Sequence, residues 1–230
     1  MDVRPAILIP ARWGSTRLPG KMLTDLRGKT LIRRVYESCI ESEIPTFVIT
    51  DSMRIQNEIG TDAILEPEGE NGTDRLCAWV NKSEMALSYD VYINVQGDMP
   101  DIKPRHIKEV LELLQKFRVA TLYTDFKNDE DQMNPNSVKI VCNKNRAVWF
   151  GRGITGYGHH HLGIYGYHHN ELRQYRFLKK YLPEKVEKLE QLRWLMNGVD
   201  IGIAKTKFKG IEINTPEDIL KWDEEVPLHL

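Results

Sequence analysis

Several features that mark particular protein classes are missing from the 230-residue sequence. Its 32 lysines and arginines nearly balance 33 acidic residues, and the net charge is -1. This balance gives no basic field for nucleic acid and no polybasic signal for a membrane surface. No apolar run approaches the length of a membrane span, and the first strand candidate begins too early to follow a signal peptide. We therefore expect a cytoplasmic protein that binds neither nucleic acid nor membrane.

Cysteine is also scarce. Cys39, Cys77 and Cys142 are odd in number, and their spacing fits neither a metal site nor a redox motif. We expect reduced thiols, as is usual in the cytoplasm. The hydrophobic content of 41% is ordinary for a globular protein, and the length suits one large α/β domain or a core with a small lobe.

The stretch from Ile7 to Lys21 carries the strongest local pattern. Residues 6–9 are apolar and predict a buried strand, which we expect Pro10 to end. Three cations, Arg12, Arg17 and Lys21, follow among glycines and hydroxyl residues. Small residues let the backbone approach a ligand, and the carboxyl end of a strand is where open α/β sheets bind ligands. The pattern favours a site for a nucleotide triphosphate over a solvated basic loop.

The remaining chain predicts an α/β fold with a change of pattern near its middle. Strands at 46–50, 62–65 and 91–95 alternate with helices at 30–42, 53–59, 73–87 and 104–117, which indicates a parallel, doubly wound sheet. Beyond residue 119 the strand candidates are closely spaced, at 119–123, 138–141, 147–150 and 163–167. Helices at 170–181 and 186–197, a strand at 201–204 and a last helix opening at Thr215 complete the prediction. We expect one domain, with a core over 1–120 and 210–230 and a mixed lobe over 121–209.

Other polar residues have weaker local patterns. Asp98 follows a strand and is placed either to hold Mg²⁺ or to cap a turn. Residues 72–75 open a helix whose N–H groups could bind an anion, but the local pattern favours a capped surface helix. Three consecutive histidines, 159–161, cannot chelate one ion from a strand, because neighbouring side chains point to opposite faces. Of these, His161 could bind an acidic substrate. Glu190, Gln191 and Arg193 read as the solvated face of a helix.

Eight ordered blocks together resemble the 3-deoxy-manno-octulosonate (Kdo) cytidylyltransferase family over essentially the whole chain. The blocks are residues 9–12 with 15–21, 50–51, 72–76, 94–98, 134–139, 161–167, 189–193 and 215–218. The resemblance implies a Rossmann-like nucleotidyltransferase fold with a mostly parallel central sheet and a mixed dimerisation lobe. It also implies an enzyme of lipopolysaccharide biosynthesis that joins CTP to a 2-keto-3-deoxy sugar acid, releases pyrophosphate, needs Mg²⁺ and works as a cytoplasmic homodimer.

The resemblance also assigns roles to individual residues. The catalytic residues would be Arg12, Lys21 and Asp98. The nucleotide would be bound by Pro10, Ala11, Arg12, Ser15, Lys21, Arg75 and Gln96. The sugar acid would be bound by Gln96, Arg152, His161, Tyr165, Glu190 and Gln191. Asp98 and the residue at position 214 would hold the metal ion.

The chain departs from the family pattern at three places. Asn214 stands where the family has the second aspartate of the metal site, and Met99 replaces a glutamate after Asp98. Glu212, two residues before Asn214, would point the same way in a strand and could help to hold the metal. Residues 151–158 form a short loop with four glycines near the expected sugar site. The sugar is therefore Kdo, its 8-amino analogue or another sugar acid. A weakly catalytic protein that binds CTP or a CMP-sugar is the alternative from a different functional class.

Overall fold

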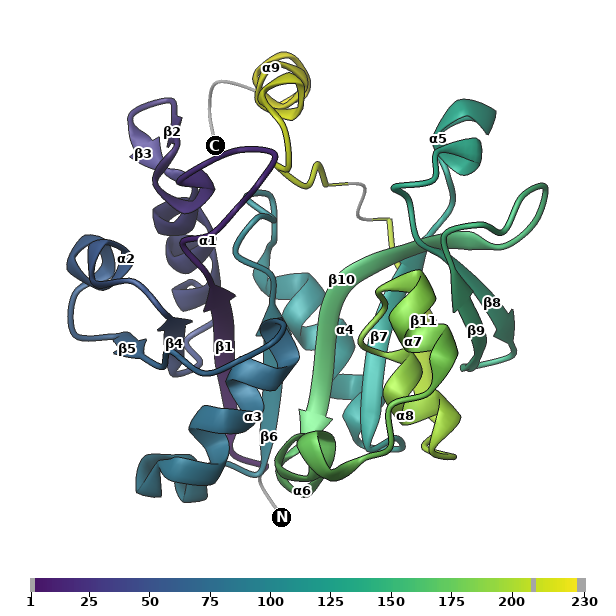
Figure 1. The fold of residues 1–230 in the computed structure, drawn as a ribbon, viewed down its shortest axis with the longest axis horizontal. Helices are drawn as coiled ribbons and strands as arrows, with labels where there is room; N and C mark the ends of the chain where they lie inside the picture. The colour runs from purple at the N-terminus through teal and green to yellow at the C-terminus, as the bar shows by residue number, and fades with distance from the viewer. Residues whose placement is uncertain (1–2, 208–209, 227–230) are drawn as a thin grey trace.

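The computed structural model describes residues 3–207 and 210–226, whose strands form a nine-stranded sheet and a separate hairpin, β2–β3 (Figure 1). The strands are β1 (Pro5–Ala11), β2 (Asp25–Leu26), β3 (Lys29–Thr30), β4 (Thr46–Thr50), β5 (Ala63–Leu65), β6 (Val91–Val95), β7 (Val119–Thr124), β8 (Lys139–Asn143), β9 (Arg146–Gly151), β10 (His159–His168) and β11 (Ile201–Lys205). The α-helices are α1 (Leu31–Ile40), α2 (Met53–Ile59), α3 (Gly72–Lys82), α4 (Pro104–Leu114), α5 (Asp129–Met133), α6 (His169–Gln174), α7 (Leu182–Glu187), α8 (Leu192–Met196) and α9 (Pro216–Glu225). No helix in these two ranges is long and apolar enough to cross a membrane.

The first half of the sheet is parallel, as the sequence predicts. Strands β5, β4, β1 and β6 lie side by side in that order, with Ile7 opposite Thr46 on one side and Ile93 on the other. The prediction that Pro10 ends β1 is wrong, because Pro10 still pairs with Ile49. Pairing with β6 stops at Leu8, so Pro10 has a single neighbouring strand, which a residue without an N–H tolerates.

Strand β10 joins the two halves of the sheet. It runs antiparallel to β6 and β7, and its first residues also pair with β8. Beyond it, β11 is parallel to β7, and β9 and β8 form an antiparallel edge. The predicted mixed lobe is thus a continuation of the core sheet. The pairing of β10 with β7 shifts register between His161 and Tyr165. This irregular part of β10 lies beside the site described below.

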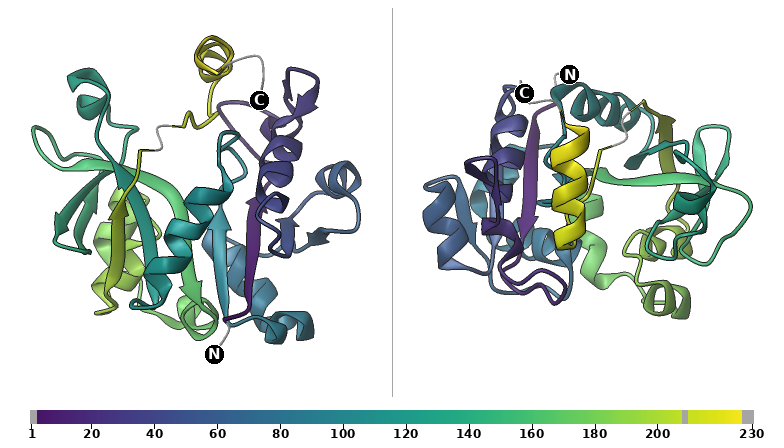
Figure 2. Two further views of the ribbon diagram at one scale, coloured as in Figure 1. Left: turned by 180° about the vertical axis from the view of Figure 1, so that it is seen from behind. Right: turned by 90° about the horizontal axis from the view of Figure 1, so that it is seen from above.

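Helices cover both faces of the sheet, because the strand side chains alternate between two apolar cores. Ile7 and Ile9 belong to a core that includes residues of α1 and α4, whereas Ala6 and Leu8 face α3. Seen from behind, α4 crosses the opposite face of the sheet from α3 and α8 (Figure 2). Burial of both strand faces provides the main driving force for this layered arrangement.

Three predicted helices are shorter than expected, and one is divided. The helix predicted over 186–197 is two helices, α7 and α8, separated by a turn over 188–191. Lys188 adopts a left-handed backbone conformation with φ of 54°, which stops α7. Similarly, an extended Ser83 ends α3 at Lys82, and a 3₁₀ turn over 84–88 follows. Helices α4 and α6 end at Leu114 and Gln174, before the predicted residues 117 and 181.

Candidate functional site

Within residues 3–207 and 210–226, two cavities meet at the carboxyl ends of β1 and β6. The first, the loop cavity, is about 360 Å³ and lies beside the segment that follows β1. The second, the lobe cavity, is about 410 Å³ and lies between β10, the turn over 188–191 and the segment before α9. Both cavities are lined by Arg17, Gln96, Asp98, Glu190 and Asn214. Two ligands bound in them would therefore touch, as group transfer requires.

The loop after β1 is fixed from the neighbouring strand. The Trp13 N–H donates to Asp51 Oδ1 at 2.8 Å, and the Arg54 guanidinium lies 4.8 Å from the centre of the Trp13 ring. Gly20 has φ of 68°, and the Trp13 ring packs against it. The loop thus folds back on its own tryptophan. Its cations, including the exposed Arg12, line the open side of the loop cavity.

Lys21 joins the two cavities. It opens a short 3₁₀ helix over Lys21–Leu23 and is 8% exposed. Its Nζ donates to Asp98 Oδ2 at 2.7 Å and to Asn214 Oδ1 at 3.0 Å. Arg17 also donates to Asn214 Oδ1, at 3.1 Å, and the Ile213 N–H donates to the Asp98 carbonyl at 3.0 Å. Side-chain oxygens of Asp98 and Asn214, which are far apart in the sequence, therefore both accept from the Lys21 ammonium group.

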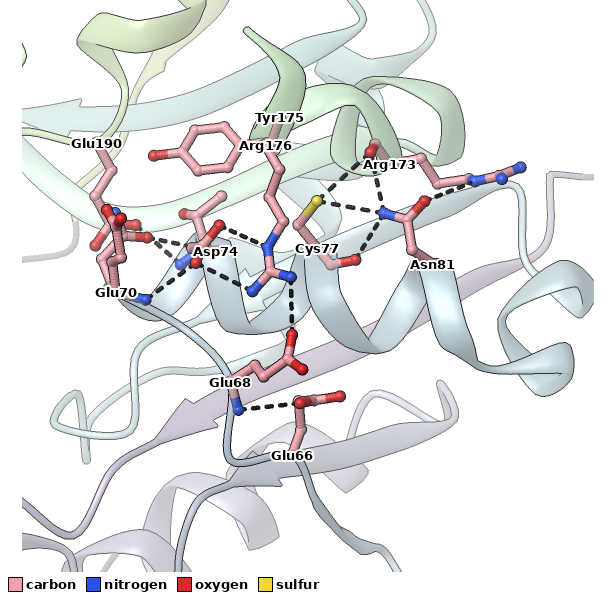
Figure 3. Close-up of polar contacts among 12 residues, drawn as sticks. Glu66, Glu68, Glu70, Asp74, Cys77, Asn81, Arg173, Tyr175, Arg176 and Glu190 are labelled. Carbon is pink, nitrogen blue, oxygen red and sulfur yellow. Dashed lines mark hydrogen bonds and ion pairs between the residues drawn. The ribbon is translucent and has the colours of Figure 1, made fainter. Parts of the chain in front are cut away.

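The far wall of the loop cavity is an acidic segment over 66–72, held by arginines. Arg75 is 5% exposed; it donates to Asp51 Oδ2 at 3.0 Å and to the Glu66 carbonyl. Gly69 has φ of 151°, and a side chain there would lie 2.7 Å from Arg75 Cβ, so only glycine fits. Figure 3 shows Arg176, from the lobe, reaching Asp74 and Glu68 across this segment, at 2.8 Å and 3.2 Å.

The turn between α7 and α8 brings Glu190 and Gln191 to the cavities. Glu190 Oε2 accepts the Thr73 N–H at 2.9 Å, at the start of α3, and burial raises the pKa of Glu190. Gln191 is 2% exposed, and its Nε2 has no partner within the described residues. Arg193 anchors the turn, because its Nε lies 3.0 Å from the buried Glu184 carboxylate on α7. The interpretation of Glu190 and Gln191 as a solvated helix face is wrong.

His161 on β10 is neutral and has a defined tautomer. The Thr121 hydroxyl lies 2.7 Å from the Ile164 carbonyl and 3.0 Å from His161 Nε2. Its one proton goes to the carbonyl, so Nε2 donates and Nδ1 is left as an acceptor. Burial, with the nearby His160 and Arg152, lowers the pKa of His161 to about 3. This residue suits a hydroxyl group of a ligand better than a carboxylate.

Arg152 and Tyr165 complete the wall of the lobe cavity. Arg152 belongs to the glycine-rich loop and is tied to the chain: its N–H donates to Glu187 Oε2 at 2.7 Å and its Nε to the Glu187 carbonyl at 3.2 Å. Tyr165 is buried, and burial raises its pKa, so the hydroxyl stays protonated. These two residues add a cation and a neutral hydroxyl donor to a cavity that also contains Gln191 and His161.

Comparison with known proteins gives one consistent result. Residues 6–201 match the cytidylyltransferase family model. The chain is 37% identical to the 3-deoxy-manno-octulosonate cytidylyltransferase of Parabacteroides distasonis, over 93% of this chain and 94% of the relative. It is 36% identical to the 8-amino-3,8-dideoxy-manno-octulosonate cytidylyltransferase of Shewanella baltica, over 96% and 97%. A solved CMP:2-keto-3-deoxy-manno-octonic acid synthetase in complex with CTP is 33% identical, with a TM-score of 0.86 over 97% of this chain and 100% of that one. The chain belongs to the Kdo cytidylyltransferase family. The family resemblance and the fold expected from the sequence are thereby confirmed.

Every residue that the family resemblance selects lines at least one of the two cavities. The loop cavity holds Pro10, Ala11, Arg12, Ser15, Lys21, Arg75, Gln96, Asp98, Glu190 and Asn214. The lobe cavity holds Gln96, Asp98, Arg152, His161, Tyr165, Glu190, Gln191 and Asn214. Several of them, Arg75 and Glu190 among them, are bound by protein partners. Such residues shape the cavities and position the chain, and their roles toward ligands stay predictions.

Two contacts of the site were not predicted from the sequence. Arg17 reaches Asn214, and Asp51 ties the Trp13 N–H to Arg75. Both residues lie inside the family blocks, which was the available indication. Glu212, which the sequence offered as a help to Asn214, lines the lobe cavity and is exposed to water.

The oxygen ligands at the junction fit a Mg²⁺ ion. Mg²⁺ takes carboxylate, amide and phosphate oxygens, usually with only one or two from carboxylates of the protein. Asp98 and Asn214 present such oxygens, and the Lys21 ammonium shows that both can face one cation. The described residues contain no group of three or more histidine, cysteine or acidic side chains that could hold a metal.

Proposed function

We propose that the protein transfers CMP from CTP to the anomeric hydroxyl of Kdo or its 8-amino analogue and releases pyrophosphate. The observation that carries the proposal is the junction of Lys21, Asp98 and Asn214, where a cation and two oxygen ligands lie between the two cavities. Support comes from the names of the relatives, which are cytidylyltransferases for these two sugar acids, and from the similar structure solved with CTP.

The triphosphate would occupy the loop cavity. Arg12, Arg17 and Lys21 carry positive charge that would offset the negative charge of the triphosphate. Lys21 is already buried at the junction of the two cavities. The sugar hydroxyl would attack the α-phosphorus from the lobe cavity. As the new phosphorus–oxygen bond forms, the bond to the pyrophosphate oxygen breaks, and these cations stabilise the departing charge.

The sugar acid would occupy the lobe cavity. The unpartnered Gln191 amide can donate a hydrogen bond to an oxygen of the sugar acid, and His161 Nδ1 can accept a hydrogen bond from a sugar hydroxyl. Arg152 adds a positive charge for the carboxylate. Arg152 would therefore face the carboxylate of the sugar acid, and Gln191 and His161 would face its other oxygen atoms.

Mg²⁺ would be held by Asp98 and Asn214, and when bound it would neutralise charge on the reacting phosphate. The amide at position 214 supplies an oxygen but no charge. The family resemblance also supports a cytoplasmic homodimer with residues 121–209 at the interface.

The first test is pyrophosphate release from CTP with Kdo, 8-amino-Kdo or sialic acid, each with Mg²⁺ and with Mn²⁺. We expect turnover with one of the octulosonates and none with sialic acid. Lys21→Met should reduce kcat by about a hundredfold or more, because it removes charge stabilisation at the reacting phosphate. Lys29→Met is the matched control, since Lys29 pairs with Glu37 on the surface. CTP binding with no turnover on any sugar acid, even in Asn214→Asp, would instead indicate a nucleotide-binding protein.

A further inference from the structure

Lys139, the first residue of β8, is a buried charge that the proposed function leaves without a role. It is 0% exposed, and its Nζ donates to three backbone carbonyls, those of Asn134 at 2.7 Å, Arg152 at 2.9 Å and Ser137 at 3.2 Å. Three acceptors use all three protons of an ammonium group, so the side chain is charged. Burial of an ammonium group is costly, and carbonyl oxygens take the place of water here.

The three carbonyls belong to two separate parts of the cavity wall. Two are in the segment over 134–137, which lines the lobe cavity, and the third is that of Arg152, in the glycine-rich loop over 151–158. The end of this loop also rests on β8: Gly158 has φ of 88°, and a side chain there would lie 3.4 Å from Lys139 Cβ. Lys139 therefore holds the segment and the loop together.

This arrangement fixes one side of the Arg152 side chain. Its N–H and Nε donate to Glu187 on α7, and its Nη1 donates to the Asn136 carbonyl, in the segment that Lys139 holds. Its Nη2 forms no hydrogen bond within residues 3–207 and 210–226, and Arg152 lines the lobe cavity. One edge of the guanidinium is thus held by the protein, and the other is left to bind a ligand.

We propose that Lys139 is the positioning residue for Arg152 and thereby sets the affinity of the lobe cavity for the carboxylate of the sugar acid. Without the ammonium group, the segment and the loop lose their common attachment, and the guanidinium loses its fixed direction. The inference rests on the proposed function, because it takes the sugar acid as the ligand of this cavity. It also explains how a loop with four glycines keeps one conformation: its two ends are attached to β8.

Steady-state kinetics of the full chain with Kdo, or with 8-amino-Kdo if the parent prefers it, measure the effect. Lys139→Met should raise KM for the sugar acid about tenfold and leave KM for CTP within about twofold, because the loop cavity keeps its cations. In an Arg152→Met background, the same substitution should raise KM for the sugar acid by less than about twofold, since the group that Lys139 positions is gone.

The matched control is Lys127→Met. Lys127 lines the lobe cavity itself and pairs with Glu225, so it tests the effect of removing a positive charge without loosening the loop. We expect its KM for the sugar acid to stay within about twofold of the parent value. Lys139→Gln, an uncharged amide with two donors, takes the place of Lys139→Met if that variant does not fold. It should show the same dependence on Arg152.

Trypsin gives a measurement that needs no turnover. It can cut after Arg152 only when the loop leaves its attachments, so Lys139→Met should be cut there about threefold faster or more, as judged from the masses of the fragments. Lys127→Met should be cut after Arg152 at the parent rate. The CTP affinity of each variant shows that it is folded.

The outcomes separate the inference from the proposed function. If the parent turns over and Lys139→Met leaves KM for the sugar acid unchanged, the inference is wrong and the proposed function stands. Equal effects of Lys139→Met with and without Arg152, or a rise as large in Lys127→Met, would also overturn the inference. A parent that turns over no sugar acid would overturn the proposed function. Equal rates of cutting after Arg152 would then still show that Lys139 does not hold the loop.

Discussion

At the scale of single residues, burial fixes the protonation states of His161 and Tyr165 beside the lobe cavity, because it lowers the pKa of His161 and raises that of Tyr165. His161 is the clearest case. Its Nε2 proton is held by Thr121, and the low pKa of about 3 keeps the ring neutral at physiological pH. In the neutral ring, Nδ1 remains an acceptor for the sugar hydroxyl that we propose to bind there. The need to keep the ring neutral also makes the stability of the folded chain depend on pH.

This dependence has a definite sign. The unfolded chain binds a proton at His161 below its ordinary pKa of 6.5, whereas the folded chain does not until about pH 3. Stability therefore falls as pH decreases through 6.5. Between pH 7.5 and 5.5, we expect the free energy of unfolding to fall in both proteins. The fall should be about 1.4 kcal/mol smaller in His161→Gln than in the parent.

Urea unfolding at the two pH values measures the difference. The control is His159→Gln, on the same strand, whose ring is 41% exposed and pairs with Asp125. If the His161 variant loses as much stability on acidification as the parent and this control, the neutral ring makes no such contribution.

Much of the candidate site could be predicted from short sequence blocks, but its internal bonds could not. Lys21 and Asp98 were selected because each follows a strand, and parallel strands end at one edge of a sheet. The pairing of Arg75 with Asp51, by contrast, depends on where α3 packs against β4. Nothing local to Arg75 shows that its guanidinium is used within the protein, and the family resemblance assigned it a ligand contact instead.

At the scale of elements, the wall of the loop cavity is joined to the lobe by a set of ion pairs that we call the lobe clasp. It consists of Arg176 with Asp74 and Glu68 (Figure 3), and of Lys180 with Glu70. These pairs connect the region of α6 and α7 with the segment that shapes the nucleotide side. The geometry of one cavity is thereby linked to the other.

We expect Arg176→Met to weaken CTP binding several-fold, because the wall of the loop cavity loses its anchor while the cations of the loop remain. Isothermal titration with CTP measures the change. Arg173→Met is the matched control: it lies on α6 and reaches Asn81, outside the clasp. Equal CTP affinity in both variants would show that the clasp does not position the nucleotide wall.

Elements with a clear pattern of apolar residues were predicted well. An element whose end depends on the backbone conformation of one residue was not. Residues 91–95 are apolar except for Asn94, and β6 has these bounds. The divided helix was missed because Leu189 and Leu192 continue a helical spacing across the turn. The left-handed conformation of Lys188 that ends α7 is rare for lysine, and no local pattern indicates it.

At the scale of the whole molecule, one sheet runs through both halves of the chain. Strand β10 contacts β6 on one side and β7 on the other, so the predicted core and lobe share hydrogen bonds and apolar layers. We expect one cooperative unfolding transition as a result. Far-ultraviolet circular dichroism and tryptophan fluorescence should give the same midpoint in urea. Separated midpoints would show that the lobe unfolds independently.

The tryptophan in the loop after β1 has a consequence of its own. Trp13 is half-buried, stacked against Arg54 and bonded through its backbone to Asp51, whereas Trp79, Trp194 and Trp222 lie in the cores. A triphosphate bound as we propose would draw the loop cations inward, and it would alter the electric field at this indole more than at the buried ones. The chain would thus carry its own optical reporter beside the loop cavity, with no label attached.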